Sequence, residues 1–175
     1  MFAGFLIATL GAGCVTPGGG GTELFNGKNL DGWEVTDFAG GGAIKVKDGE
    51  IHMAMGELIS GINLAHENIP RTNYELEAEA MKLDGNDFFC GLTFPVGDTF
   101  ASFIPGGWGG TVVGLSSIDG MDAAENETAT FKQFKTHQWY HFRVRVTPGK
   151  IQCWVDDEMV VDLLLEDRAI ALRAG

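Results

Sequence analysis

Three glutamates recur at every second position of one segment, and they are the first residues that could carry acid–base chemistry. Glu75, Glu77 and Glu79 alternate with apolar residues between Tyr74 and Met81, so a β-strand would place all three carboxylates on one face. On a concave, partly desolvated face, crowding of like charges would favour a retained proton, which a general acid needs. On a convex face the same glutamates would face solvent, as on any half-exposed strand.

Three further polar residues could join these carboxylates. Asp87, His141 and Arg143 each fall on the polar side of an alternating apolar segment. If those sides are concave, they would line one groove, and the sequence leaves open which face that is. The other histidines, His52, His66 and His137, lack the short spacings of zinc ligands.

A glycine-rich stretch, Gly106 to Thr128, combines an aromatic residue with the densest group of acidic and amide side chains. Trp108 stands between two Gly-Gly pairs, so its ring could be exposed on a loop and available for stacking on a ligand. The alternative is a tryptophan that plugs the end of the fold. Ser116, in the same stretch, lacks the sequence context of a nucleophile elbow, which argues against a serine hydrolase.

Acidic and amide side chains crowd the second half of this stretch. Asp119, Asp122, Glu125 and Asn126 lie within eight positions. Oxygen ligands at this density could hold Ca²⁺ or another divalent cation such as Mn²⁺, although the spacing is not that of an EF-hand. A solvated acidic loop is the other interpretation.

The elements that must position these residues are short strands. Alternating apolar and polar runs are separated by turn residues, of which Asp48-Gly49 is a strong hairpin signal. Alternation also marks Asp87 to Phe94, Trp139 to Val146 and Ile151 to Asp156, and no window keeps a helical period. With 26 glycines in 175 residues, the pattern predicts an all-β, antiparallel β-sandwich.

The net charge excludes some classes of binding partner, and the N-terminal residues indicate the cellular compartment. A formal net charge of −12 argues against nucleic acid and anionic membrane surfaces. The first 21 residues carry no charge, and the apolar run Phe2 to Leu10 is too short to span a bilayer, which is typical of a secretory signal. Small residues before Cys14 resemble a lipoprotein signal, so Cys14 is predicted to be lipidated. An ordinary cleaved signal or a disordered N-terminus are the alternatives.

We therefore expect an exported protein, periplasmic or on the cell surface, that meets the membrane only through a lipid anchor. Residues 1–22 would be the signal and a glycine-rich tether, and residues 23–175 the folded domain. Cys90 and Cys153 lie in apolar strand patterns, which favours two buried free thiols over a disulfide.

Several segments resemble one bacterial family. LFNGKNLDGWEV, from Leu24 to Val35, is similar to the opening of the 3-keto-disaccharide hydrolase (DUF1080) domain, and the later strands, including WYHFRVRV, fit it as well. The resemblance covers about residues 23 to 172 and implies a concanavalin-like jelly roll. Such domains usually add a final strand after the position of Gly175, so a truncated C-terminus is expected.

The resemblance also implies an activity, cleavage of glycosidic bonds in 3-keto-glycosides by hydrolysis or by elimination and hydration. In that chemistry Glu79 or Asp87 would act as base or acid, and Arg143 would stabilise an enolate. Trp108 would stack on the saccharide. Ser116, Asn126 and His141 would contact the substrate, and Asp119 and Glu125 would bind a cation.

Two departures from the family pattern keep other functions open. Phe89-Cys90-Gly91 stands where many relatives carry Asn-Ser-Gly, and Gly114 and Ser116 stand where a Glu and a Gln are common. A non-catalytic carbohydrate-binding or adhesion module is therefore the alternative, with a structural domain of a surface assembly as a third possibility.

Overall fold

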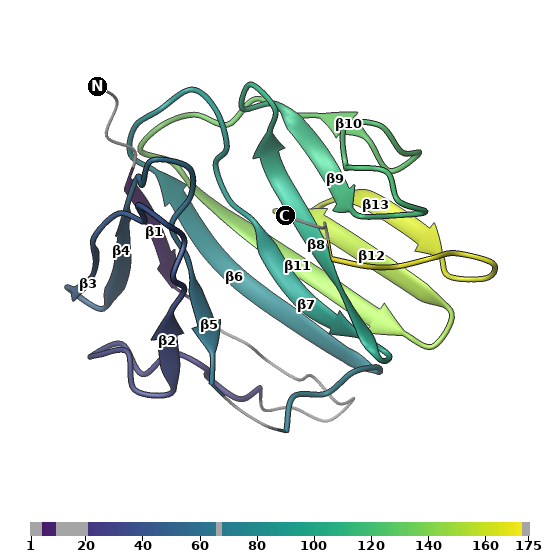
Figure 1. Ribbon diagram of the computed structural model, residues 1–175, viewed down its shortest axis with the longest axis horizontal. Coiled ribbons are helices and arrows are strands. Elements are labelled where there is room, and N and C mark those ends of the chain that lie inside the picture. Colours follow the sequence, from purple (N-terminus) through teal and green to yellow (C-terminus); the bar gives the residue numbers. More distant parts are fainter. Residues whose placement is uncertain (1–4, 10–20, 66–67, 173–175) are drawn as a thin grey trace.

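The computed structural model describes residues 5–9, 21–65 and 68–172, and the described chain is all-β. Its strands form sheets of seven, four and two strands, with every neighbouring pair antiparallel (Figure 1). Within these residues no helix is long and apolar enough to cross a membrane. The predicted all-β, antiparallel sandwich is confirmed.

The largest sheet runs in the order β13-β12-β11-β6-β1-β4-β3. Its strands are β13 (Glu158–Leu164), β12 (Lys150–Val155), β11 (Trp139–Thr147), β6 (Tyr74–Lys82), β1 (Phe5–Thr9), β4 (Glu50–Ala54) and β3 (Ile44–Lys47). The second sheet comprises β10 (Thr130–Phe131), β9 (Val112–Ser116), β8 (Thr99–Gly107) and β7 (Leu92–Val96). The third pairs β2 (Trp33–Val35) with β5 (Ile62–Leu64).

The main core lies between the seven-stranded and four-stranded sheets. Phe142 and Val144 of β11 and Phe94 and Phe103 of the smaller sheet are all fully buried in one cluster. Burying this apolar surface is the main force that holds the two sheets face to face. A second, smaller cluster around Ile51 lies beside β3 and β4.

The predicted turns form for the expected reasons. Asp48 and Gly49 join β3 to β4 with φ values of 54° and 83°. Both values are positive, as a type I′ hairpin requires, and the Asp-Gly pair tolerates them. Pro148 and Gly149 likewise connect β11 to β12 at the pair Thr147 and Lys150.

The strand predicted over Asp87 to Phe94 is shorter than expected. At Phe88 and Phe89, the buried and exposed side chains are the reverse of those predicted. Residues 83–91 form the connection between the two sheets, and β7 begins only at Leu92. Phe89 is buried and Phe88 is 46% exposed, whereas the alternation predicted the opposite. The Phe89 N–H donates to the Gly106 carbonyl, and its ring packs against Phe134, so tertiary contacts override the local pattern.

Both cysteines in the described domain behave as predicted. Cys90 and Cys153 are free and buried. Burial raises the pKa of the Cys90 thiol to about 12 and that of Cys153 well above its usual value. Neither thiol is therefore ionised at neutral pH.

The N-terminal segment lies partly in the sheet. Phe5–Thr9, part of the predicted export signal, forms β1 between β6 and β4. Cys14 and most of the predicted tether lie outside the described residues, so the lipidation site and the boundary at residue 22 stay predictions.

Candidate functional site

The non-core sides of β6 and β11 bring together three of the predicted site residues. Ala78 and Phe142 point into the core, so the residues adjacent to them in the strands lie on the opposite face. In the register of the two strands Glu79 is the Cα partner of His141, and Glu77 is that of Arg143. We call this surface the β6–β11 face; it comprises Glu75, Glu77, Glu79, His141, Arg143 and Arg145.

An imidazole and a carboxylate are adjacent on this face. His141 Nε2 lies 3.7 Å from Glu77 Oε2, and the two side chains are 39% and 35% exposed, so a ligand can reach both. Neighbouring Glu75 is bound by Arg145 and is less exposed. The His141–Glu77 pair is thus the accessible acid–base pair of the face.

Arg143 is supported by an aromatic ring. Its guanidinium carbon lies 4.1 Å from the centroid of the Trp154 ring on β12, and that of Arg145 lies 5.4 Å from the same ring. Trp154 is only 8% exposed, although it lies on the non-core side, because the two guanidinium groups lie over it. Stacking of this kind orients a guanidinium without consuming its N–H donors.

The structure places Asp87 away from the β6–β11 face, which corrects the prediction that it faces outward from a strand. Asp87 lies in the connection after β6, and its Oδ1 accepts a hydrogen bond of 2.8 Å from the Gly109 N–H. The next residue, Phe88, packs its ring 5.0 Å from that of Trp108. Asp87 and Phe88 therefore support the Trp108 loop.

Trp108 itself is partly exposed on a glycine-built loop. Its φ is 41°, and Gly106, Gly109 and Gly110 have φ values near 80°. A Cβ on Gly110 would lie 2.8 Å from the Asn86 carbonyl oxygen, so the loop can approach the connection only with glycine there. Trp108 is thus half-buried against Phe88, and both its stacking on a ligand and its alternative role as a plug stay predictions.

The acidic loop after β9 is organised by internal hydrogen bonds. Asn126 is buried, and its amide donates to the carbonyls of Leu115, Met121 and Asp122 while its Oδ1 accepts from Thr128. Ser116 Oγ lies 3.0 Å from Asp122 Oδ1, to which it donates. The polar atoms of Ser116 and Asn126 thus serve the loop itself.

Asp119 ties this loop to the C-terminal segment. Its carboxylate accepts from the Ala169 N–H and from Arg168, and these hydrogen bonds hold the pKa of that carboxyl below its usual value. Glu125 is exposed. Across the described ranges, no three His, Cys, Asp or Glu side chains gather in a way that could hold a metal ion.

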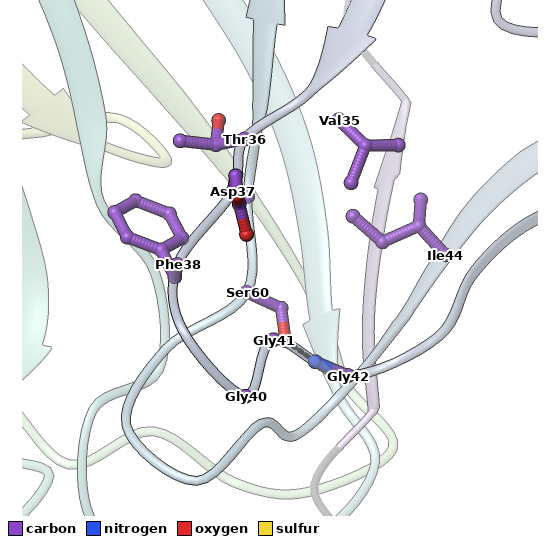
Figure 2. A pocket seen from close by; sticks show the side chains of 10 residues that line it. Val35, Thr36, Asp37, Phe38, Gly40, Gly41, Gly42, Ile44 and Ser60 are labelled. Carbon is purple, nitrogen blue, oxygen red and sulfur yellow. Dashed lines mark hydrogen bonds between the residues drawn. The ribbon is translucent and has the colours of Figure 1, made fainter.

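A cavity of about 340 Å³ lies elsewhere, at the end of the two-stranded sheet (Figure 2). Val35, Asp37, Phe38 and Ile44 line it together with glycines, and the Gly42 N–H donates to Ser60 Oγ at 2.8 Å. None of the residues predicted for the site lines this cavity.

The structure therefore separates the predicted residues into three groups. Glu79, His141 and Arg143 share the β6–β11 face, and Asp87 is hydrogen-bonded to the glycine loop that carries Trp108. The third group comprises Ser116 at the end of β9 and Asp119, Glu125 and Asn126 in the loop that follows. Sequence reasoning did not single out Glu77 as the partner of His141, or Trp154. The alternation of both strands already placed them on polar sides, but the strand register was needed to pair them.

The fold and this face define a class, an antiparallel β-sandwich that presents acid, base and guanidinium groups on one sheet. Residues 20–173 match the family model of the 3-keto-alpha-glucoside-1,2-lyase-like domain, and the chain belongs to this family. The resemblance to the DUF1080 family is thereby confirmed, and membership supports a glycan-active domain in general. No curated protein matches the chain. No solved structure matches it either.

Proposed function

We propose that this domain cleaves the glycosidic bond of 3-keto-glycosides by elimination across C1 and C2 followed by hydration. The observation that carries the proposal is the β6–β11 face, where His141, Glu79 and Arg143 lie together within a family named for this chemistry. We also propose that the protein is exported and anchored through a lipid on Cys14, as its uncharged N-terminus suggests.

Each group on the face has a role in this reaction. The C3 ketone acidifies the C2 proton, which Glu79 removes as general base while the electron pair moves into an enolate. Arg143, held on Trp154, stabilises the enolate oxygen. The enolate then expels the glycosidic oxygen from C1, and His141, held by Glu77, protonates that oxygen as it leaves. Water finally adds across the C1–C2 double bond.

The test is turnover of a 3-keto-disaccharide and of the parent disaccharide by the full chain. Products are followed by NMR, with and without Mn²⁺ or Ca²⁺. Replacing the base, Glu79→Gln, should lower kcat by about 10²-fold or more. Glu166→Gln, a change at an exposed residue outside the face, is the matched control and should leave kcat unchanged. If the wild-type chain turns over neither sugar under any of these conditions, the enzymatic proposal is wrong.

A non-catalytic glycan-binding function is the second candidate. It is favoured by the separation of Trp108 and Asp87 from the β6–β11 face, because a stacking loop by itself can bind a sugar without cleaving it. Saccharide binding without turnover, lost on Trp108→Ala and retained on Glu79→Gln, would establish this alternative.

A further inference from the structure

The N-terminal strand occupies a central position in the largest sheet. Leu6, Ile7 and Ala8 of β1 are each paired with residues of β4 and of β6. In the described part of the chain, β1 is the only strand that joins β3 and β4 to the rest of this sheet. Strand β1 is thus held on both edges and itself holds two parts of the sheet together.

Without β1, the sheet would contain a gap one strand wide. Strands β4 and β6 run parallel to each other, since each is antiparallel to β1. Their facing edges would then expose unpaired N–H and C=O groups, and such edges readily take up another extended segment. We call this gap the β4–β6 slot; it is bounded by Glu50–Ala54 and Tyr74–Lys82.

The residues along the slot define what fits into it. Ala8 is the Cα partner of both Ile51 and Ala80, which are 0% and 1% exposed, so an apolar residue suits that position. The two bounding strands carry charges of both signs, Glu50 and Glu79 together with Lys82, which is the Cα partner of Leu6, so an uncharged occupant meets no net attraction or repulsion there. The β1 segment, FLIAT, carries no charge.

The same five residues belong to the segment that the sequence predicts as an export signal. A residue that lies in the slot cannot also be removed with a signal peptide, so export with cleavage would empty the slot. We propose that the β4–β6 slot is a strand-acceptor site, which binds an uncharged extended peptide segment of another polypeptide once β1 has left. The proposal relies on the proposed export only for the fate of β1, and its test involves no sugar.

The first experiment tests whether β1 lies in the slot in solution. In a full chain carrying Cys14→Ser, the pair Ile7→Cys and Met81→Cys joins Cα partners and should form a disulfide on mild oxidation. The matched control, Ile7→Cys with Glu77→Cys, is displaced by four residues on the same strand and should not. Equal cross-linking of both pairs, or of neither, would overturn the proposal.

The second experiment opens the slot in the folded protein. Residues 17–21 are replaced by a protease recognition site, the folded chain is cleaved there, and a fluorescent peptide with the sequence of residues 3–11 and a solubilising lysine tag is added in excess. We expect the peptide to co-elute with the protein and its anisotropy to rise. The same peptide with Ile7→Pro should bind at least about tenfold more weakly, because proline removes a ladder hydrogen bond inside a sheet.

The remaining outcomes also decide the question. Equal binding of both peptides would show attachment outside the slot and would overturn the proposal. Retention of the cleaved N-terminal piece without exchange would show that the slot does not open. If cleavage unfolds the protein and excess peptide does not restore the fold, the slot is not an acceptor and the proposal is overturned.

Discussion

Asn126 provides the sharpest test of how the loop after β9 is held. The residue is 5% exposed, and its side chain makes hydrogen bonds from both ends of the amide. The Nδ2 group reaches the Leu115 carbonyl at 2.8 Å, and Oδ1 accepts from the Thr128 N–H at 2.9 Å. Asn126→Ala removes every one of these bonds at once.

The expected cost follows from the groups left behind. A buried donor or acceptor without a partner costs about 1–3 kcal/mol. Counting only the Thr128 N–H and the Leu115 carbonyl, the free energy of unfolding should fall by about 3 kcal/mol. For a domain of this size, that loss corresponds to a Tm lower by roughly 6–12 °C.

Urea unfolding followed by tryptophan fluorescence measures this loss as a shift of the midpoint at constant slope. Asn126→Asp keeps an acceptor for Thr128 but loses the Nδ2 donors. At a pH low enough to protonate the new carboxyl, its free energy of unfolding should lie between those of wild type and Asn126→Ala. Glu125→Ala, at the exposed neighbour, should change stability by less than about 0.5 kcal/mol.

A loss below about 1 kcal/mol for Asn126→Ala would refute this reasoning. The sequence predicts instead that Asn126 contacts the sugar. Weakened saccharide binding by a variant of unchanged stability would support that prediction over the structural role.

Three further predictions concern surface and core groups. Trp108→Ala should weaken saccharide binding several-fold in titration calorimetry, whereas Leu58→Ala, at an apolar residue that is 82% exposed outside the glycine loop and the β6–β11 face, should not; equal effects would remove the stacking role. Asp119→Asn should destabilise the fold at pH 7, and the deficit should shrink as pH falls below about 4, because a carboxyl with a lowered pKa stabilises only while ionised. Cys90 and Cys153 should resist a thiol reagent at pH 8 in the native protein and react on unfolding; rapid native reaction would contradict their burial.

The alternation of side chains was enough to predict most strands near the site. The run from Tyr140 to Val146 predicts β11 and its buried side correctly, because this strand is long and one of its faces is fully apolar. The same rule failed at Phe88 and Phe89. There the chain crosses between sheets, and packing on Phe134 decides which ring is buried.

Candidate site residues on regular strands were easier to group than those on loops. Glu79, His141 and Arg143 were predicted to lie on polar sides, and the register brings them onto one face. Asp87 was expected to join them only if those sides were concave, and the structure places it on a connection where its carboxylate accepts a hydrogen bond from the Gly109 N–H. Loop geometry depends on contacts between segments far apart in the chain, which local patterns do not encode.

The sequence by itself determined the all-β class, the hairpin at Asp48-Gly49, the two buried thiols and the family, because each depends on local alternation, turn chemistry or a contiguous motif. Only the tertiary structure decided that His141 meets Glu77, that Arg143 lies on Trp154, and that Phe5–Thr9 enters the largest sheet. These pairings join residues distant in sequence. They depend on strand order and register, which follow from the packing of the whole sandwich.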